Sequence, residues 1–319
     1  MFWGLVVFMP VGVTYLAAIL LLLALLGAGG WRERIARLRT SPLWWPVMAY
    51  VTWTLLVLAT QPHYPQTASN LAHGLRIALT ILMALALTRT EALWALRGFV
   101  LMALVNMGLI ALYYSVGFPL LEPWRAVLVL GALLVAGLSQ LPAVQQNFQL
   151  GLSEVAAAQA GTVSEGSWVV RYYMYRDTAQ MIIDKPLAGW GIGGWTQQWL
   201  ARAPALLADY NMPHNDFLWM GAQAGLPGLL CLLSILLTGV WQAWRRPDMA
   251  GRLALAATLI ALVATSLNSA LRDAQIGLSL LWVVVLYLRL TQEAPEAAPW
   301  RDLWPRRRQT SAPKPSAVF

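Results

Sequence analysis

The chain has 319 residues, of which 59% are hydrophobic and 11% charged, and it carries a formal net charge of +8. Soluble domains carry about 25% charged residues, so this composition excludes an ordinary soluble globular protein. The basic residues lie in short segments between apolar runs, as they do in the cytoplasmic loops of membrane proteins, so the positive charge does not indicate binding to nucleic acid. The single cysteine, Cys231, excludes an intrachain disulfide.

Long apolar runs predict an all-α fold, a polytopic transmembrane helical bundle with about eight spans, because about 20 apolar residues in a helix cross the hydrocarbon core. The runs lie at residues 2–29, 43–60, 71–88, 92–116, 124–141, 226–244, 252–268 and 275–290. The chain then divides into N-terminal transmembrane helices (1–141), a long, partly helical polar loop (142–225), C-terminal transmembrane helices (226–290) and a tail rich in Pro, Ala and charge that we expect to be disordered (291–319).

The orientation of the bundle follows from the placement of arginine. Arg245, Arg246 and Arg252 place the connection between spans six and seven in the cytoplasm, and the basic tail agrees with them. The long loop then lies on the outer side of the membrane. The basic segment WRERIARLR (31–39) also belongs inside, yet counting eight spans onward from it puts the long loop inside as well. In the back half of the chain these three arginines and the basic tail agree, so we take the orientation from them. The number of spans is least certain near residues 116–125.

A helix is predicted at SWVVRYYMYRDTAQMIID (167–184), with Ser167 as a possible N-cap and the pair Lys185-Pro186 ending it. Two of its arginines are candidates for binding an anion. Arg171 shares a face with residues four and seven positions later, whereas Arg176 lies about 140° around the helix. We therefore expect the two arginines not to serve one ligand. The alternative is that both extend to lipid headgroups.

The next segment, PLAGWGIGGW (186–195), matches the letters G-x-G-x-x-G of dinucleotide-binding turns. Such a site needs a preceding strand within a βαβ unit, but here a helix and a proline precede the glycines. A tight turn at the membrane surface is the better interpretation, with Trp190, Trp195 and Trp199 expected at the lipid interface.

The stretch NMPHNDFLWMGAQAGLPGLL (211–230) places a histidine before a helix that Asn215 or Asp216 caps and that Gly225 and Pro227 break. The helix dipole at this position disfavours imidazolium and favours anions. A neutral His214 beside an anion site is a candidate general base. It is equally compatible with a capping role that involves no chemistry.

The other polar groups give weaker signals. His63 and His73 have no partner pattern, and we expect both to be structural. The acidic residues of the long loop and His214 lack the spacing of metal ligands. Neither a nucleophile elbow nor a phosphate-binding P-loop is present.

Three of these pieces, in this order, resemble the O-antigen ligase and polymerase superfamily. In that family an arginine-containing helix precedes a P-L-x-G-x-G turn, which is followed by P-H-N and a G-x-x-G on the next helix. The matching segments here are Arg171 with RDTAQMIIDKP (176–186), PLAGWGIGG (186–194) and PHNDFLWMGAQAGLPG (213–228). Residues 1–165 match only as membrane helices. Family members usually have more spans and a Ser-Arg helix entrance, which is absent near 116–125.

The resemblance implies a multi-pass protein of the bacterial inner membrane that is a metal-independent glycosyltransferase without a cofactor. Such enzymes move a glycan from an undecaprenyl-diphosphate donor to a glycan acceptor at the periplasmic side, in contact with membrane lipid. The resemblance makes His214 the candidate base or acceptor-orienting residue and Arg171 the candidate diphosphate ligand. Candidate substrate-binding residues around them are Arg176, Tyr175, Asn215, Gly191 and Trp190, and aromatic residues of the loop, among them Tyr172, Tyr175, Trp190 and Trp195, are candidates for stacking on sugars.

Three functions remain open on the sequence. The first is transfer to a lipid A-core sugar, as an O-antigen ligase performs. The second is glycan polymerisation or protein O-oligosaccharyl transfer, which share the loop motifs. The third, a transporter or non-catalytic flippase partner, predicts paired ionisable groups at mid-membrane. The spans here are nearly free of charge, with Arg76 and Arg97 near span ends, which disfavours it.

Overall fold

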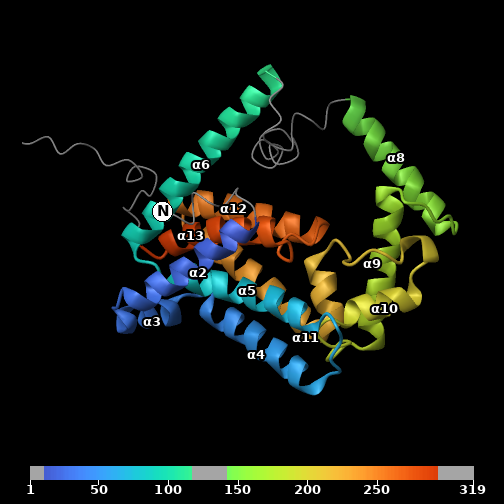
Figure 1. Cartoon of the computed structure of the whole chain (residues 1–319), viewed down its shortest axis with the longest axis horizontal. Coiled ribbons are helices and arrows are strands. Elements are labelled where there is room, and N and C mark those ends of the chain that lie inside the picture. The colour runs from blue at the N-terminus through green and yellow to red at the C-terminus, as the bar shows by residue number, and fades with distance from the viewer. Residues whose placement is uncertain (1–10, 117–141, 294–319) are drawn as a thin grey trace, which may run out of the picture.

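The computed structural model describes residues 11–116 and 142–293, and the predictions for residues 1–10, the fifth span (124–141) and most of the tail lie outside them (Figure 1). The all-α prediction is confirmed, since the described residues form helices and no strand. The helices are α2 (Val11–Gly27), α3 (Trp31–Thr40), α4 (Trp44–Thr60), α5 (Thr67–Ala86), α6 (Arg89–Val116), α8 (Pro142–Gln159), α9 (Ser167–Asp184), α10 (Gly194–Arg202), the 3₁₀ turn η1 (Ala205–Leu207), α11 (Asp216–Trp244), α12 (Met249–Leu267) and α13 (Ala274–Leu290).

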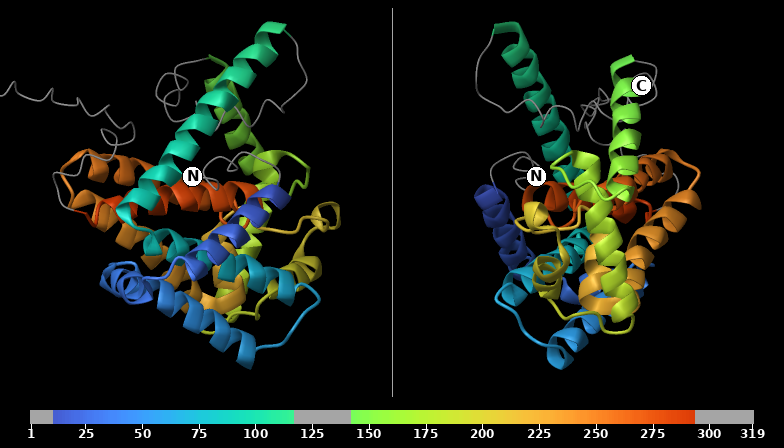
Figure 2. Two further views of the ribbon diagram at one scale, coloured as in Figure 1. Left: turned by 60° about the vertical axis from the view of Figure 1, so that its left-hand side comes forward. Right: turned by 90° about the vertical axis from the view of Figure 1, so that its right-hand side faces the viewer.

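Five apolar helices, α4, α5, α11, α12 and α13, form a bundle (Figures 1 and 2). Helix α11 packs against α4 and α12, and α13 packs against α5 and α12. Among the described helices, α5, α11 and α12 are long and apolar enough to cross a membrane, and α2 with α3, bent by 116°, can count as a fourth span. Helix α4 and residues Ile276–Leu290 of α13 are apolar but shorter. The described residues therefore support a membrane bundle without establishing the predicted count of about eight spans.

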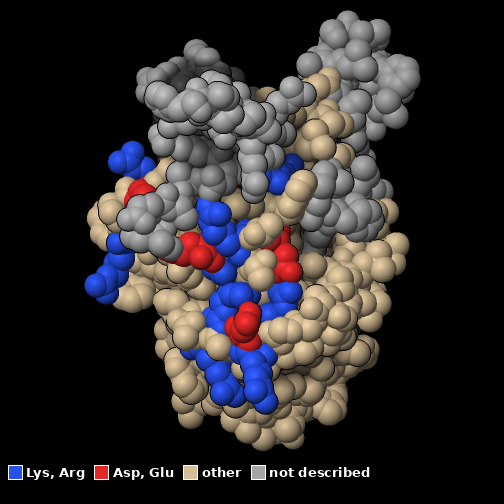
Figure 3. All heavy atoms as spheres, turned by 90° about the vertical axis from the view of Figure 1, so that its left-hand side faces the viewer, with Lys and Arg blue, Asp and Glu red and all other residues tan. Residues whose placement is uncertain are grey.

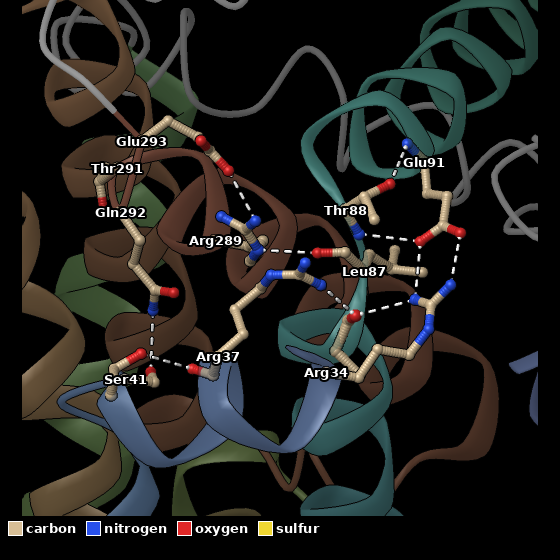
Figure 4. A network of polar contacts seen from close by, with 12 residues as sticks. Arg34, Arg37, Ser41, Leu87, Thr88, Glu91, Arg289, Thr291, Gln292 and Glu293 are labelled. Carbon is tan, nitrogen blue, oxygen red and sulfur yellow. Dashed lines mark hydrogen bonds and ion pairs between the residues drawn. The ribbon is translucent and has the colours of Figure 1, made fainter. Parts of the chain in front are cut away.

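One end of the bundle gathers arginines from segments far apart in the sequence, and we call it the basic end (Figure 3). Figure 4 shows its polar network. The guanidinium of Arg34 forms two hydrogen bonds with the carboxylate of Glu91, at 2.7 and 2.9 Å, and donates a third to the carbonyl of Ala86. Arg37 donates to the same carbonyl at 2.7 Å, and Arg289 donates to that of Leu87 at 2.8 Å. Three arginines thus satisfy carbonyls at the C-terminus of α5, where the helix dipole favours cations.

The basic end also includes the connection between α11 and α12. Arg246 donates to the carbonyls of Thr291 and Glu293, and Gln292 donates to the hydroxyl of Ser41. The arginines of the front and back halves, which gave conflicting span counts, therefore lie at one end of the same bundle. The conflict arose from the number of spans assigned between them, in a stretch that includes residues outside the description.

Helices α9 and α10 build a second core at the opposite end of the bundle, which we call the loop end (Figure 1). The rings of Trp195 and Trp199 stack with centroids 5.5 Å apart, and both side chains are at most 1% exposed. The indole N–H of Trp195 donates to the buried hydroxyl of Thr178, and that of Trp199 to the carbonyl of Leu207. The expectation that these two tryptophans lie at the lipid interface is wrong. They are four residues apart on one face of α10, and that face packs onto α9.

The loop end is joined to the bundle where α11 breaks, at Gly225 (φ 69°, ψ −175°), as the sequence predicts. Pro227 has no N–H to offer the carbonyl of Gln223. The turn at 186–194 supplies the missing donors, because the N–H of Trp190 bonds Ala222 O at 2.8 Å and that of Gly191 bonds Gln223 O at 3.0 Å.

Two further contacts complete this junction. The indole of Trp53 on α4 donates to Ala224 O at 2.7 Å, and the N–H of Leu226 returns a bond to Pro186 O at 2.7 Å. A Cβ on Gly225 would lie 2.3 Å from Leu187 O. The broken helix and the turn can therefore approach this closely only with glycine at this position.

Gly225→Ala should lower the melting temperature of the detergent-purified protein much more than Gly161→Ala. Both glycines have positive φ, but a Cβ at Gly161 meets nothing within 4 Å. Alanine at Gly161 should cost only the left-handed backbone strain, about 1–2 kcal/mol. Alanine at Gly225 adds a collision with backbone. Thermal melts followed by tryptophan fluorescence measure the difference, and equal losses for the two variants would contradict the junction described above.

Candidate functional site

His214 lies in a tight turn just before α11 and is the one non-glycine residue with positive φ (52°) in the described part of the chain. The prediction that Asn215 caps α11 is confirmed, since its Oδ1 accepts the N–H of Leu218 at 3.0 Å. The Nδ2 of Asn215 donates to the carbonyl of Ser266, at the end of α12, at 2.8 Å. The cap therefore also holds the histidine turn against α12.

Asp216 has a different role from the capping that the sequence allowed. Its buried carboxylate accepts the backbone N–H groups of Leu271 at 2.8 Å and Arg272 at 3.3 Å. These bonds fasten the first turn of α11 to residues 268–273, the connection between α12 and α13. The histidine turn is thus held on two sides by the same connection.

Tyr175 links α9 to the histidine turn. Its hydroxyl donates to the carbonyl of His214 at 3.1 Å and lies 3.4 Å from that of Ser266. Burial raises the pKa of Tyr175, with the charge of Arg171 and a hydrogen bond to Asn215 opposing the rise. The phenol therefore stays protonated, and able to donate, at neutral pH.

A cavity of about 630 Å³ opens along the same face of α9, and we call it the arginine pocket. Its lining residues are Val155, Trp168, Arg171, Tyr172, Tyr175, Arg176 and Leu267. Both arginines line this pocket, although they lie about 140° apart around α9, and whether they serve one ligand stays a prediction. Lining positions 168, 171, 172, 175 and 176 form the usual stripe of an amphipathic helix face, more than 100° wide. The arginines lie at its two edges, and their long side chains both reach the pocket.

A family model described as O-antigen ligase matches residues 75–233, a range that contains α9, the glycine turn and His214. The chain belongs to the O-antigen ligase and polymerase superfamily. It is thus a membrane enzyme of the O-antigen ligase or polymerase type, although no curated protein matches the chain.

In this O-antigen ligase family member, two predicted substrate-binding residues hold the turn and do not line the arginine pocket. Trp190 donates its indole N–H to the carbonyl of Met181 at 2.9 Å, and the ammonium of Lys185 lies 4.1 Å from its ring centroid. Gly191 is buried, and a Cβ there would lie 2.8 Å from the carbonyl of Pro62. The carbonyl of Trp190 also accepts the hydroxyl of Tyr64 at 2.7 Å, so both residues hold the loop end on the connection between α4 and α5.

Sequence reasoning missed two polar residues in the connection between α12 and α13. Asn268 contacts the ring of His214, with 3.0 Å between its Oδ1 and the imidazole Nδ1. Arg272 lies over the ring of Trp219 and donates to the side chain of Asn211, and burial lowers the pKa of its guanidinium against the opposing charge of Asp216. No local motif marks either residue, because each meets its partners only after more than 50 residues of intervening chain fold.

The other two histidines lie apart from this site. The ring of His63 contacts the carbonyl of Leu58, and His73 is half-buried on α5. Among the described residues, no group of three His, Cys, Asp or Glu side chains is arranged to hold a metal ion.

Tyr175→Phe should speed hydrogen–deuterium exchange of residues 208–215, because the carbonyl of His214 loses the donor that restrains it. Tyr172→Phe is the matched control. Tyr172 also lines the pocket, but its hydroxyl bonds to no described residue. Exchange measured by mass spectrometry on the purified protein separates the two variants. Unchanged exchange in Tyr175→Phe would remove the coupling between α9 and the histidine turn.

Proposed function

We propose that this chain is a membrane glycosyltransferase that moves a glycan from undecaprenyl diphosphate to a lipid A-core sugar, as an O-antigen ligase does. The observation that carries the proposal is the sharing of Tyr175. Its ring lines the arginine pocket, and its hydroxyl holds the carbonyl of His214. Tyr175 thereby connects a candidate base to a cationic surface for phosphate.

The proposed reaction replaces one C–O bond by another. The acceptor hydroxyl gives its proton to His214 while its oxygen forms a bond to C1 of the donor sugar. The bond from C1 to the diphosphate oxygen breaks, and undecaprenyl diphosphate leaves with the electron pair. A positioned guanidinium offsets the charge that grows on the leaving phosphate.

Arg171 is better suited to that charge than Arg176. Arg176 pairs with the carboxylate of Asp177 at 2.6 Å and packs over the ring of Tyr173, with 4.7 Å to the centroid. Among the described residues, Arg171 hydrogen-bonds only with Ser167, one turn earlier on α9, and has no carboxylate partner. Its charge is therefore available for a ligand in the pocket, and its planar fork matches the oxygens of a phosphate.

The proposed orientation places the loop end in the periplasm of a bacterium with an inner membrane. The basic end gathers Arg34, Arg37, Arg246 and Arg289, and such clusters belong on the cytoplasmic side. The periplasm is where a glycan acceptor would meet the donor. Independence from a divalent metal stays a prediction from the sequence.

The decisive test is transfer by purified protein from an undecaprenyl-diphosphate-linked glycan. Three acceptors are offered separately: lipid A-core, a second lipid-linked glycan and an acceptor protein. We expect glycan to appear on lipid A-core, as a shift in gel migration of the lipopolysaccharide. Product only on the second glycan or on protein would replace the ligase by a polymerase or a protein transferase. No product on any acceptor would reject the proposed function.

His214→Ala should lower the transfer rate roughly 10²–10⁴-fold, the usual contribution of a general base, while the protein accumulates normally in the membrane. His63→Ala is the control, because His63 is exposed and does not line the pocket. Rates are compared at equal amounts of purified protein. A near-normal rate in His214→Ala would reduce this residue to a structural one.

Arg171→Lys should reduce transfer strongly, whereas Arg176→Lys should be mild. Lysine keeps the charge but loses the two-pronged geometry that a phosphate needs. At position 176 a lysine can still pair with Asp177. Transfer rates at matched protein levels decide between the two, and a severe Arg176→Lys beside a mild Arg171→Lys would show that the other edge of the pocket binds the donor.

A further inference from the structure

Among the described residues, the ring of His214 has one hydrogen-bond partner, and it lies at the end of α12. The Oδ1 of Asn268 lies 3.0 Å from the imidazole Nδ1. Asn268 is the C-cap residue of α12, and its own N–H bonds the carbonyl of Ala264, so its backbone is anchored to that helix. The contact therefore ties the ring orientation to the end of a membrane helix.

A second hydrogen bond identifies the atom of Asn268 that faces the ring. The same Oδ1 accepts the backbone N–H of Ser269 at 2.9 Å. A backbone N–H only donates, so the side-chain atom that it meets must be the carbonyl oxygen and not the amide nitrogen. An oxygen that only accepts must in turn face a ring nitrogen that carries a proton.

The protonation of the imidazole follows from this arrangement. A neutral His214 bound to Asn268 carries its proton on Nδ1, and the lone pair is on Nε2. No described residue hydrogen-bonds Nε2. The nitrogen that can accept a proton from an incoming hydroxyl is thus unprotonated and unoccupied.

We propose that Asn268 is a positioning residue that holds the neutral His214 in the Nδ1-protonated form, with Nε2 as the catalytic base. The catalytic half of this statement rests on the proposed glycan transfer, and the tautomer stands without it. Asn268 acts through His214 and touches no reacting atom. Tyr175 acts on the backbone of the same histidine. Its hydroxyl donates to the carbonyl of His214, which does not restrain the ring.

Because Asn268 is exposed, its effect on the orientation of His214 can be measured separately from any effect on folding stability. Asn268 is exposed and His214 half-buried, and a hydrogen bond open to water contributes little to folding. Removing the side chain should therefore leave the melting temperature almost unchanged. A base whose proton is on the wrong nitrogen, however, cannot accept another in the required geometry.

Nitrogen NMR on protein labelled with ¹⁵N-histidine tests the tautomer directly. The chain has only three histidines. The signal that disappears in His214→Ala is therefore that of His214. Above the pH at which the ring is protonated, we expect the His214 signals of the wild type to report a protonated Nδ1. Asn268→Ala should move them toward the Nε2-protonated form. A wild-type signal from the Nε2-protonated form would overturn the proposal.

Transfer rates test whether the tautomer matters for the reaction. Asn268→Ala should slow transfer roughly 10–100-fold, as loss of an orienting partner does for metal-bound histidines. The matched control is Asn211→Ala, which removes another exposed asparagine of the site, bonded to Arg272 and not to the histidine. A normal rate in Asn268→Ala would overturn the positioning role.

Asn268→Asp supplies the pH signature of a direct contact. Aspartate can still accept both hydrogen bonds, so transfer should persist at neutral to alkaline pH. Its charge stabilises the imidazolium, so activity should be lost at a higher pH than in the wild type as the solution is acidified. The other ionisable groups on elements around the turn do not change between variants: Tyr175, Arg171, Asp216, Arg272 and Asp273. An unshifted acidic limb would contradict the contact.

The two assays also separate this proposal from the proposed function. If the wild type transfers no glycan but its NMR spectrum shows the Nδ1-protonated ring, the glycosyltransferase assignment fails and the tautomer stands. If transfer is normal in the wild type and in Asn268→Ala, the function stands and the positioning role falls.

Discussion

A helix in a membrane cannot leave its backbone carbonyls without donors, because lipid offers no hydrogen bonds. Helix α11 breaks at Gly225, and the carbonyls that the break releases find their donors in the glycine turn and in the indole of Trp53. The turn therefore has to dock where it does. This one requirement attaches the loop end to the bundle and thereby fixes the position of α9 and α10 relative to it.

The attachment explains how a site can be assembled from distant segments. Helix α9 ends at Asp184, with Lys185 as its C-cap directly before the docked turn, so the position of the turn sets the direction of the helix. Trp195 and Trp199 fill the space between α9 and α10 and restrain the rotation of α9 about its axis. With α9 held, Tyr175 reaches the turn that precedes α11. The pocket and the histidine are consequently parts of one framework.

Local sequence signals predicted those features whose causes are local. The end of α9 before Pro186, the cap at Asn215 and the break at Gly225 each follow from the chemistry of one or two residues, and all three are present. The all-helical membrane fold follows from apolar length alone. The family membership was also accessible, because its motifs are contiguous.

Features that depend on tertiary packing could not be predicted. No residue close to Trp195 in the sequence indicates that its face of α10 packs against α9. The sequence therefore predicted a residue at the lipid interface. The pocket lined by Arg171 and Arg176 depends on how α9 packs against α8 and the end of α12, which the spacing of the two arginines does not reveal. The partner of His214 follows 54 residues later, after an entire hairpin of membrane helices. The basic segments likewise meet only in three dimensions.

The backbone at His214 has a consequence for the balance between stability and activity. A left-handed conformation costs a non-glycine residue roughly 1–3 kcal/mol, and glycine or asparagine would occupy φ 52° with less strain. On folding grounds alone, glycine or asparagine would therefore be the less strained residue at this position. A more robust protein should be obtainable by substitution at this one residue, at the expense of the imidazole. Screens that select only for thermostability would consequently drift toward folded variants that lack this imidazole.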